Sequence, residues 1–165
     1  MSQESSSITI GQPLPDFSVE TTAETPFTHQ DLSGHYTVIY FYPKDSTPGC
    51  TTEGKDFNQR LPEFTALNTV IYGASMDSMK RHHNFKTKQN FEFELISDPE
   101  GDFCALFGVY QLKKNFGIEY MGIVRSTFLF DPKGILIHEW RKVKVKGHAQ
   151  EVLEVIREHQ EATLK

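Results

Sequence analysis

Short runs of apolar and β-branched residues mark the expected strands of this chain. The three clearest runs cover residues 36–42, 69–75 and 94–97. Because the first run is apolar almost throughout, we expect a strand that is covered on both faces and lies at the centre of a sheet. A helix-length segment follows it, so the first two strands are predicted to be parallel and joined by a right-handed crossover.

Apolar residues spaced three and four positions apart predict a helix over residues 51–67. The residues on this spacing are Phe57, Leu61, Phe64 and Leu67. Pro62 lies within the segment and lacks a backbone donor, so we expect the helix to kink or break near Arg60.

Three further helices are expected along the chain. Their ranges are 78–90, 99–107 and 149–158. Asp98 and Pro99 suit the cap and the first position of the second of these helices. A loop that contains Gly117 and Gly122 is expected after it.

The remaining segments complete a mixed sheet. A short strand is expected at residues 17–19, and the runs 124–130 and 135–140 should pair as a hairpin. The run 141–146 alternates charged residues with valine and is expected to form a solvated edge strand. The pattern therefore predicts an α/β fold with a central mixed β-sheet flanked by helices.

Length and charge narrow the possible functions. A chain of 165 residues can bury a core without disulfides or metals, so we expect one domain over residues 1–165 with a flexible N-terminus at 1–7. The net charge of −5 argues against a nucleic-acid-binding surface, which needs clustered Lys and Arg. No apolar run approaches the roughly 20 residues that span a bilayer, and the N-terminus lacks the features of a secretory signal. With two cysteines and no C-x-x-C pair, we expect reduced thiols and a cytoplasmic protein.

Cys50 lies where the central strand gives way to a helix. The N–H groups of a first helical turn lack intrahelical partners and, with the helix dipole, favour a thiolate over a thiol. The alternative is a buried structural cysteine, which is the common state of a free cysteine. The neighbours Pro48, Gly49, Thr51 and Thr52 are turn and cap residues rather than core residues. We therefore interpret Cys50 as a reactive thiol.

The residues around Cys50 resemble the active-site signature of the peroxiredoxins, Pro43-x-x-x-Thr47-x-x-Cys50. The longer string YFYPKDSTPGCT at residues 40–51 is similar to the peroxiredoxin Q type, also called the bacterioferritin comigratory proteins. Three further segments resemble the same family in the same order: 11–17, 97–101 and 125–131. The resemblance covers nearly all of the chain, and it implies a thioredoxin-like fold with no cofactor.

The resemblance also implies a thiol-specific peroxidase that reduces hydrogen peroxide and organic hydroperoxides. Cys50 would be the peroxidatic cysteine, and Thr47 would hydrogen-bond the peroxide. Pro43 would shield the thiolate, while Arg125 would orient the peroxide and stabilise the thiolate. Thioredoxin or another thiol donor would reduce the sulfenic acid formed on Cys50. We expect a monomer or a weak homodimer.

A resolving cysteine is missing from the places where related sequences carry one. Five residues after Cys50 the chain has Lys55, and the next helix has Phe85 and Lys86. Cys104 lies among Phe and Leu residues on an expected helix, and we interpret it as structural rather than resolving.

Several polar residues allow two interpretations. Without the resemblance, Arg125 would be a surface arginine and Thr47 a turn residue. Glu53 either favours the helix dipole or holds Arg125, and we favour the first. His82 and His83 are adjacent and would point to different faces of a helix, unlike a helical metal pair, so we expect no metal site. His138 and His148 are interpreted as surface groups.

Two other functions are compatible with a reactive thiol. A Cys-His hydrolase or acyl transferase would need a histidine base within hydrogen-bond reach of Cys50. A thioredoxin-like redox sensor or binding module would oxidise at Cys50 without efficient turnover, and the missing resolving cysteine is compatible with that alternative.

Overall fold

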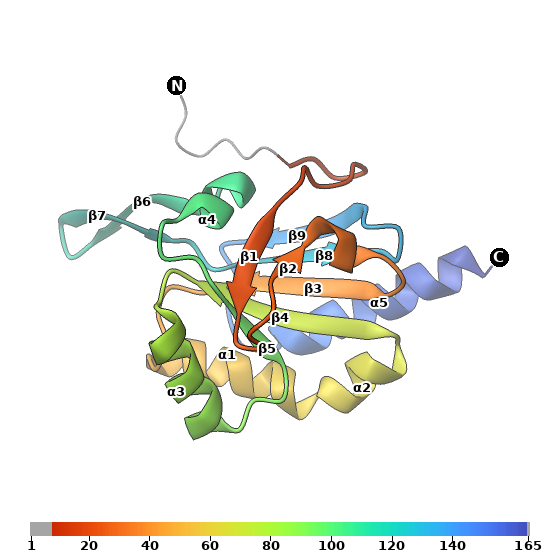
Figure 1. Cartoon of the computed structure of the whole chain (residues 1–165), viewed down its shortest axis with the longest axis horizontal. Coiled ribbons are helices and arrows are strands. Elements are labelled where there is room, and N and C mark those ends of the chain that lie inside the picture. The colour runs from red at the N-terminus through yellow and green to blue at the C-terminus, as the bar shows by residue number, and fades with distance from the viewer. Residues whose placement is uncertain (1–7, 165) are drawn as a thin grey trace.

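A mixed sheet of seven strands, in the order β2-β1-β5-β4-β3-β8-β9, forms the centre of the computed structural model (Figure 1). The structure describes residues 8–164, so the expected flexibility of residues 1–7 lies outside the described residues. The strands are β1 (Ser18–Thr21), β2 (Phe27–Thr28), β3 (Tyr36–Phe41), β4 (Thr69–Ser75), β5 (Glu94–Ser97), β8 (Ser126–Phe130) and β9 (Leu136–Arg141). β3, β4 and β5 are parallel, and the other pairs are antiparallel. The predicted mixed sheet, parallel crossover and β8–β9 hairpin are confirmed.

The sheet has helices on both faces and divides the interior into two cores. The helices are η1 (His29–Leu32), α1 (Pro48–Gln59), α2 (Leu61–Ala66), α3 (Met79–Gln89), α4 (Asp102–Phe107) and α5 (His148–Thr163). Along β3, Val38 and Tyr40 belong to the core that also holds residues of α1, α2, α3 and α5, whereas Ile39 and Phe41 belong to the core that includes α4. Every residue of β3 is buried, as its apolar run predicts. Among residues 8–164, no helix combines the length and the apolar character needed to cross a membrane.

The predicted break in the first long helix is confirmed. α1 ends at Gln59, α2 begins at Leu61, and Arg60 lies between them with φ −96° and ψ 4°. Pro62 falls in the first turn of α2, where its missing N–H would have no intrahelical partner in any case. α1 and α2 are therefore two separate helices.

Three helix boundaries differ by three residues or more from the expected ones, and the first of them is the start of α1 at Pro48 rather than at residue 51. α4 begins at Asp102 rather than at residue 99, because Gly101 adopts φ 79° immediately before it. Asp98 still caps this helix, because its carboxylate accepts hydrogen bonds from the backbone N–H groups of Phe103 and Cys104 in the first turn. α5 extends to Thr163, beyond the expected end at residue 158.

The expected loop around Gly117 and Gly122 was wrong. This segment forms a second, two-stranded sheet of β6 (Tyr110–Asn115) and β7 (Ile118–Ile123), which projects from the body in Figure 1. Phe116 and Gly117 both have positive φ, as a two-residue hairpin turn requires. The expected edge strand at 141–146 was also wrong, because β9 ends at Arg141.

Candidate active site

Cys50 lies in the first turn of α1, directly after the loop that leaves β3. α1 begins at Pro48, so the cysteine has the helix N-terminal position that the sequence predicts. Pro48 suits the first position because it lacks an N–H that would otherwise be unpaired. The Cys50 side chain turns inward, and the residue is only 1% exposed. Its surroundings are therefore set by protein groups rather than by bulk water.

Arg125 lies 75 residues after Cys50 in the sequence and contacts its sulfur. It directly precedes β8, and β8 pairs with β3 so that Ser126 lies beside Phe41, the last residue of β3. The guanidinium Nη2 lies 3.5 Å from Cys50 Sγ, and Nη1 donates to Glu53 Oε1. Burial alone would lower the pKa of Arg125, but the adjacent Glu53 and Cys50 outweigh it and raise the pKa. The structure thus places the Arg125 guanidinium beside Cys50, where its raised pKa keeps it a cation.

Glu53 belongs to the same cluster, which corrects our preference for a helix-dipole role. It follows Cys50 by three residues on α1 and is 1% exposed. Burial raises the pKa of its carboxyl from 4.5 to about 7, although the neighbouring Arg125 acts in the opposite direction. Within the described residues, its Oε2 atom and the Tyr40 hydroxyl are buried without a hydrogen-bond partner. The three-residue spacing from Cys50, which puts Glu53 on the same side of α1, was the available sequence signal that Glu53 lies near the cysteine.

Thr47 and Pro43 lie in the loop between β3 and α1. Both are half-buried, whereas Lys44 between them is exposed. Thr47 occupies the N-cap position of α1 without capping it, and its hydroxyl donates to the Lys44 carbonyl at 2.9 Å. With its proton engaged there, the hydroxyl oxygen can still accept a hydrogen bond.

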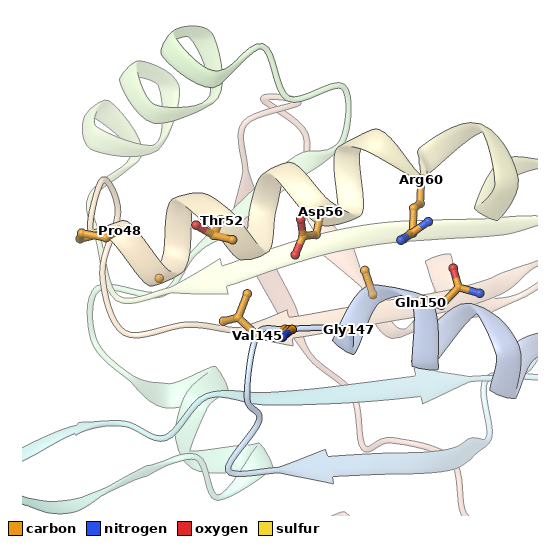
Figure 2. A pocket seen from close by; sticks show the side chains of 10 residues that line it. Pro48, Thr52, Asp56, Arg60, Val145, Gly147 and Gln150 are labelled. Carbon is orange, nitrogen blue, oxygen red and sulfur yellow. The ribbon is translucent and has the colours of Figure 1, made fainter.

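A groove of about 570 Å³ lies between α1 and the start of α5 (Figure 2). Thr52 and Asp56 line it from α1 and Arg60 from just after that helix, while residues 145–147 line it from the loop before α5 and residues 149–150 from the first turn of α5. Pro48 and Gly49 close one end, but Cys50 and Arg125 are not among the lining residues. The groove adjoins the helical turn that carries Cys50 without holding its sulfur.

His148 and His82 are both buried, which the sequence did not indicate. His148 is buried, and its Nε2 lies 2.7 Å from the Thr127 hydroxyl, so its assignment as a surface group was wrong. Burial and the nearby Arg125 lower the pKa of His148 to about 4. No adjacent residue in the sequence indicated this, because Thr127 lies on β8, 21 residues before His148.

His82 is the other buried histidine that sequence reasoning missed. Within the described chain, Asp45, Asp77 and His82 offer ligand atoms that lie within 4.8 Å of one another and could hold a metal ion. His83, by contrast, faces Glu24 at the surface. The same atoms already hydrogen-bond, since His82 Nδ1 lies 2.6 Å from Asp45 Oδ2 and Asp77 Oδ2 accepts from the Asp45 backbone N. We therefore describe the group as a hydrogen-bond network.

Cys104 lies on the opposite side of the sheet from Cys50. Both thiols are free and buried, but Cys50 belongs to the core under α1 and Cys104 to the core that includes α4. Burial raises the pKa of Cys104, and the adjacent Asp98 raises it further. A thiol in this setting stays protonated and is a poor nucleophile.

Comparison with known proteins gives matches over most of the chain. Residues 10–139 match the AhpC/TSA family. The chain is 49% identical over 154 residues to Peroxiredoxin Bcp of Bacillus subtilis. This match covers 93% of this chain and 98% of that protein.

Solved structures give the same result. The structure of Xanthomonas campestris peroxiredoxin Q is 47% identical with a TM-score of 0.85, and the match covers 91% of this chain and 98% of that one. Another structure, of the Xanthomonas campestris bacterioferritin comigratory protein, is described for its alkyl peroxide reduction activity. It is 46% identical with a TM-score of 0.85, covering 92% of this chain and 99% of that one.

Proposed function

This chain belongs to the AhpC/TSA family and is a thiol peroxidase of the Bcp/PrxQ type of peroxiredoxin, and from that premise we propose that Cys50 is its peroxidatic residue. The observation that carries the proposal is the Arg125 guanidinium 3.5 Å from the sulfur of a cysteine in a first helical turn. A cation and the free N–H groups of a first helical turn can both contact a thiolate, which is the reactive form of a cysteine.

The proposed reaction is a displacement at peroxide oxygen. The Cys50 thiolate attacks the terminal oxygen of a hydroperoxide, an S–O bond forms, and the O–O bond breaks. The other oxygen leaves with the electron pair and takes a proton, so the products are a sulfenic acid on Cys50 and water or an alcohol. The thiol is oxidised by two electrons and the peroxide is reduced by two.

Ionisation of the thiol alone cannot supply the rate of such an enzyme. A free cysteine with a pKa near 8.5 is about 3% thiolate at pH 7, so complete ionisation raises the rate only about 30-fold, or roughly 2 kcal/mol. The rest must come from fixed groups that position the peroxide and stabilise the charge on the departing oxygen. Arg125 is suited to this because its rigid fork of donors can contact both sulfur and peroxide.

Thr47 and Pro43 complete the proposed site. The Thr47 hydroxyl donates its proton to the Lys44 carbonyl. Its oxygen keeps lone pairs that can accept a hydrogen bond from the peroxide O–H. Pro43 lies in the same loop and presents an apolar ring that limits the access of water to the thiolate.

The substrates and the reductant are finer parts of the proposal. We propose hydrogen peroxide and organic hydroperoxides as substrates, which agrees with the alkyl peroxide reduction described for the Xanthomonas campestris relative. Thioredoxin or a similar thiol donor in the cytoplasm would attack the sulfenic acid, release water and then resolve the mixed disulfide. The sheet between the two cysteines supports an external reductant rather than Cys104 as the resolving thiol. We propose one domain that acts as a monomer or a weak homodimer.

The test compares two cysteine variants. Cys50→Ser should abolish peroxide consumption in the presence of dithiothreitol or thioredoxin, while its circular dichroism spectrum stays that of the wild type. Cys104→Ser is the matched control and should continue to consume peroxide. Catalytic turnover by Cys50→Ser would sink the proposal. Oxidation of Cys50 without any turnover by the wild type would instead point to a redox sensor.

A further inference from the structure

Asp45 anchors the middle of the loop of residues 43–47, which we call the active-site loop. The residue is 2% exposed. Its Oδ1 accepts a hydrogen bond from the Tyr42 hydroxyl at 2.6 Å, and its Oδ2 lies 2.6 Å from His82 Nδ1. Its backbone N donates to Asp77 Oδ2 at 2.8 Å. Side chain and backbone of Asp45 are thus both held by groups outside the loop or at its edge.

His82 connects this anchor to the rest of the fold. It lies on α3, is fully buried, and has both ring nitrogens engaged. Nε2 lies 2.8 Å from the carbonyl oxygen of Ile96 on β5, and because a carbonyl can only accept, Nε2 carries a proton. Nδ1 lies 2.6 Å from Asp45 Oδ2, so a short hydrogen bond joins the two side chains. The imidazole therefore spans the distance from β5 to the active-site loop.

The loop needs such an anchor because its turn is strained. Ser46 has φ 67°, a left-handed conformation that a residue with a Cβ adopts only when its surroundings hold it there. Asp45 precedes Ser46, and Thr47 follows it. The position of the Thr47 hydroxyl therefore depends on how firmly Asp45 is held.

We propose that His82 is a positioning residue for the peroxidase reaction. Through Asp45 it holds residues 43–47 so that Thr47 and Pro43 stand correctly beside Cys50. His82 touches neither the sulfur nor the peroxide. The inference rests on the proposed roles of Cys50 and Thr47, and it adds α3 to the elements that build the site.

Two substitutions separate the two bonds of the imidazole. In His82→Asn the amide NH₂ takes the place of Nδ1 and can still donate to Asp45. In His82→Gln it takes the place of Nε2 and can donate only to Ile96. We expect His82→Asn to keep kcat/KM for hydrogen peroxide within about threefold of the wild type, and His82→Gln to lower it by about 10- to 100-fold.

A second readout distinguishes positioning from general loss of structure. Alkylation of Cys50 by iodoacetamide needs the thiolate but not a positioned peroxide. In His82→Gln the alkylation rate should stay within about threefold of the wild type while the peroxide rate falls. His83→Gln is the matched control, because His83 is the next residue on α3 and its side chain is 41% exposed. Both rates should be unchanged in this variant.

Equal peroxide rates in the Asn and Gln variants, or a parallel loss of alkylation and peroxide reduction in His82→Gln, would overturn the inference. If the histidine variants do not fold, Tyr42→Phe removes the other side-chain donor to Asp45 with little change in shape. It should lower the peroxide rate about three- to tenfold without slowing alkylation. An unchanged peroxide rate in Tyr42→Phe would then count against the anchor. Failure of the proposed function has a separate sign, which is turnover by Cys50→Ser.

Discussion

Glu53 accepts a hydrogen bond from the Arg125 guanidinium even though burial raises the pKa of its carboxyl to about 7. One carboxylate oxygen meets the cation, while the other is buried without a partner among the described residues. The free energy of desolvating the charge therefore exceeds what the single ion pair returns. The carboxyl group that contacts Arg125 is consequently about half-ionised near neutral pH.

This pair predicts a pH dependence of stability that Glu53→Gln removes. A folded-state pKa above the unfolded value stabilises the fold below about pH 4.5, and that contribution is lost as the pH rises to about 7. The shift corresponds to roughly 3 kcal/mol in the free energy of unfolding. Urea unfolding at pH 5 and pH 7.5 should show Glu53→Gln gaining stability relative to the wild type at the higher pH.

Glu63→Gln is the control for Glu53→Gln. Glu63 pairs with Arg60 and Arg157 at the surface, so its replacement should change stability by less than about 1 kcal/mol at both pH values. The pH effect assigned to Glu53 is wrong if both variants show the same difference from the wild type.

Gly49 leaves room for Arg125, and Gly49→Ala should cost activity without costing stability. A Cβ at this position would lie 3.1 Å from Arg125 Nη2, the atom that faces Cys50. We expect Nη2 to shift away from the sulfur and kcat/KM for peroxide to fall about tenfold. The free energy of unfolding should be unchanged or up to about 1 kcal/mol higher, because alanine is the better helix former. Lys55→Ala on the same helix is the control and should leave the peroxide rate unchanged.

Cys104 should be dispensable for the reaction. After one equivalent of hydrogen peroxide, we expect the intact mass of both the wild type and Cys104→Ala to rise by one oxygen on Cys50. The variant should lose about 1–2 kcal/mol of stability, since a fully buried side chain is shortened. A wild-type mass lower by two hydrogens with a Cys50–Cys104 link, or a linked dimer, would make Cys104 the resolving thiol.

The parts of the site that could be predicted are those with a local signal. The strand of residues 36–42, the helix start at Cys50 and the break near Arg60 each follow from a few adjacent residues. The proximity of Arg125 came from the resemblance, because 75 residues separate it from Cys50 and no spacing rule connects them.

The parts that could not be predicted depend on contacts across the fold or on unusual backbone angles. Asp45 and His82 are 37 residues apart and meet only once α3 packs beside the sheet. The β6–β7 hairpin was missed because Phe116, at φ 53°, occupies a turn position that usually holds Asn, Asp or Gly. The burial of His148 was missed because no acidic or cysteine partner is evident by sequence spacing, and its partner Thr127 lies on β8.

His148 and Glu53 should have opposite effects on stability as the pH falls. Burial and Arg125 lower the pKa of His148 from 6.5 to about 4, so its contribution is present above pH 6.5 and is lost as the pH falls towards 4. Glu53 contributes in the other direction over much of the same interval. In the wild type the two effects therefore offset each other.

His148→Gln should unmask the Glu53 effect. Glutamine can still hydrogen-bond the Thr127 hydroxyl, but it takes up no proton. Between pH 7.5 and pH 5, we expect the variant to gain about 2 kcal/mol in the free energy of unfolding relative to the wild type. Urea unfolding at the two pH values measures this, with His138→Gln on β9 as the control. If His148→Gln keeps the pH profile of the wild type, His148 is already protonated in the folded protein at pH 5.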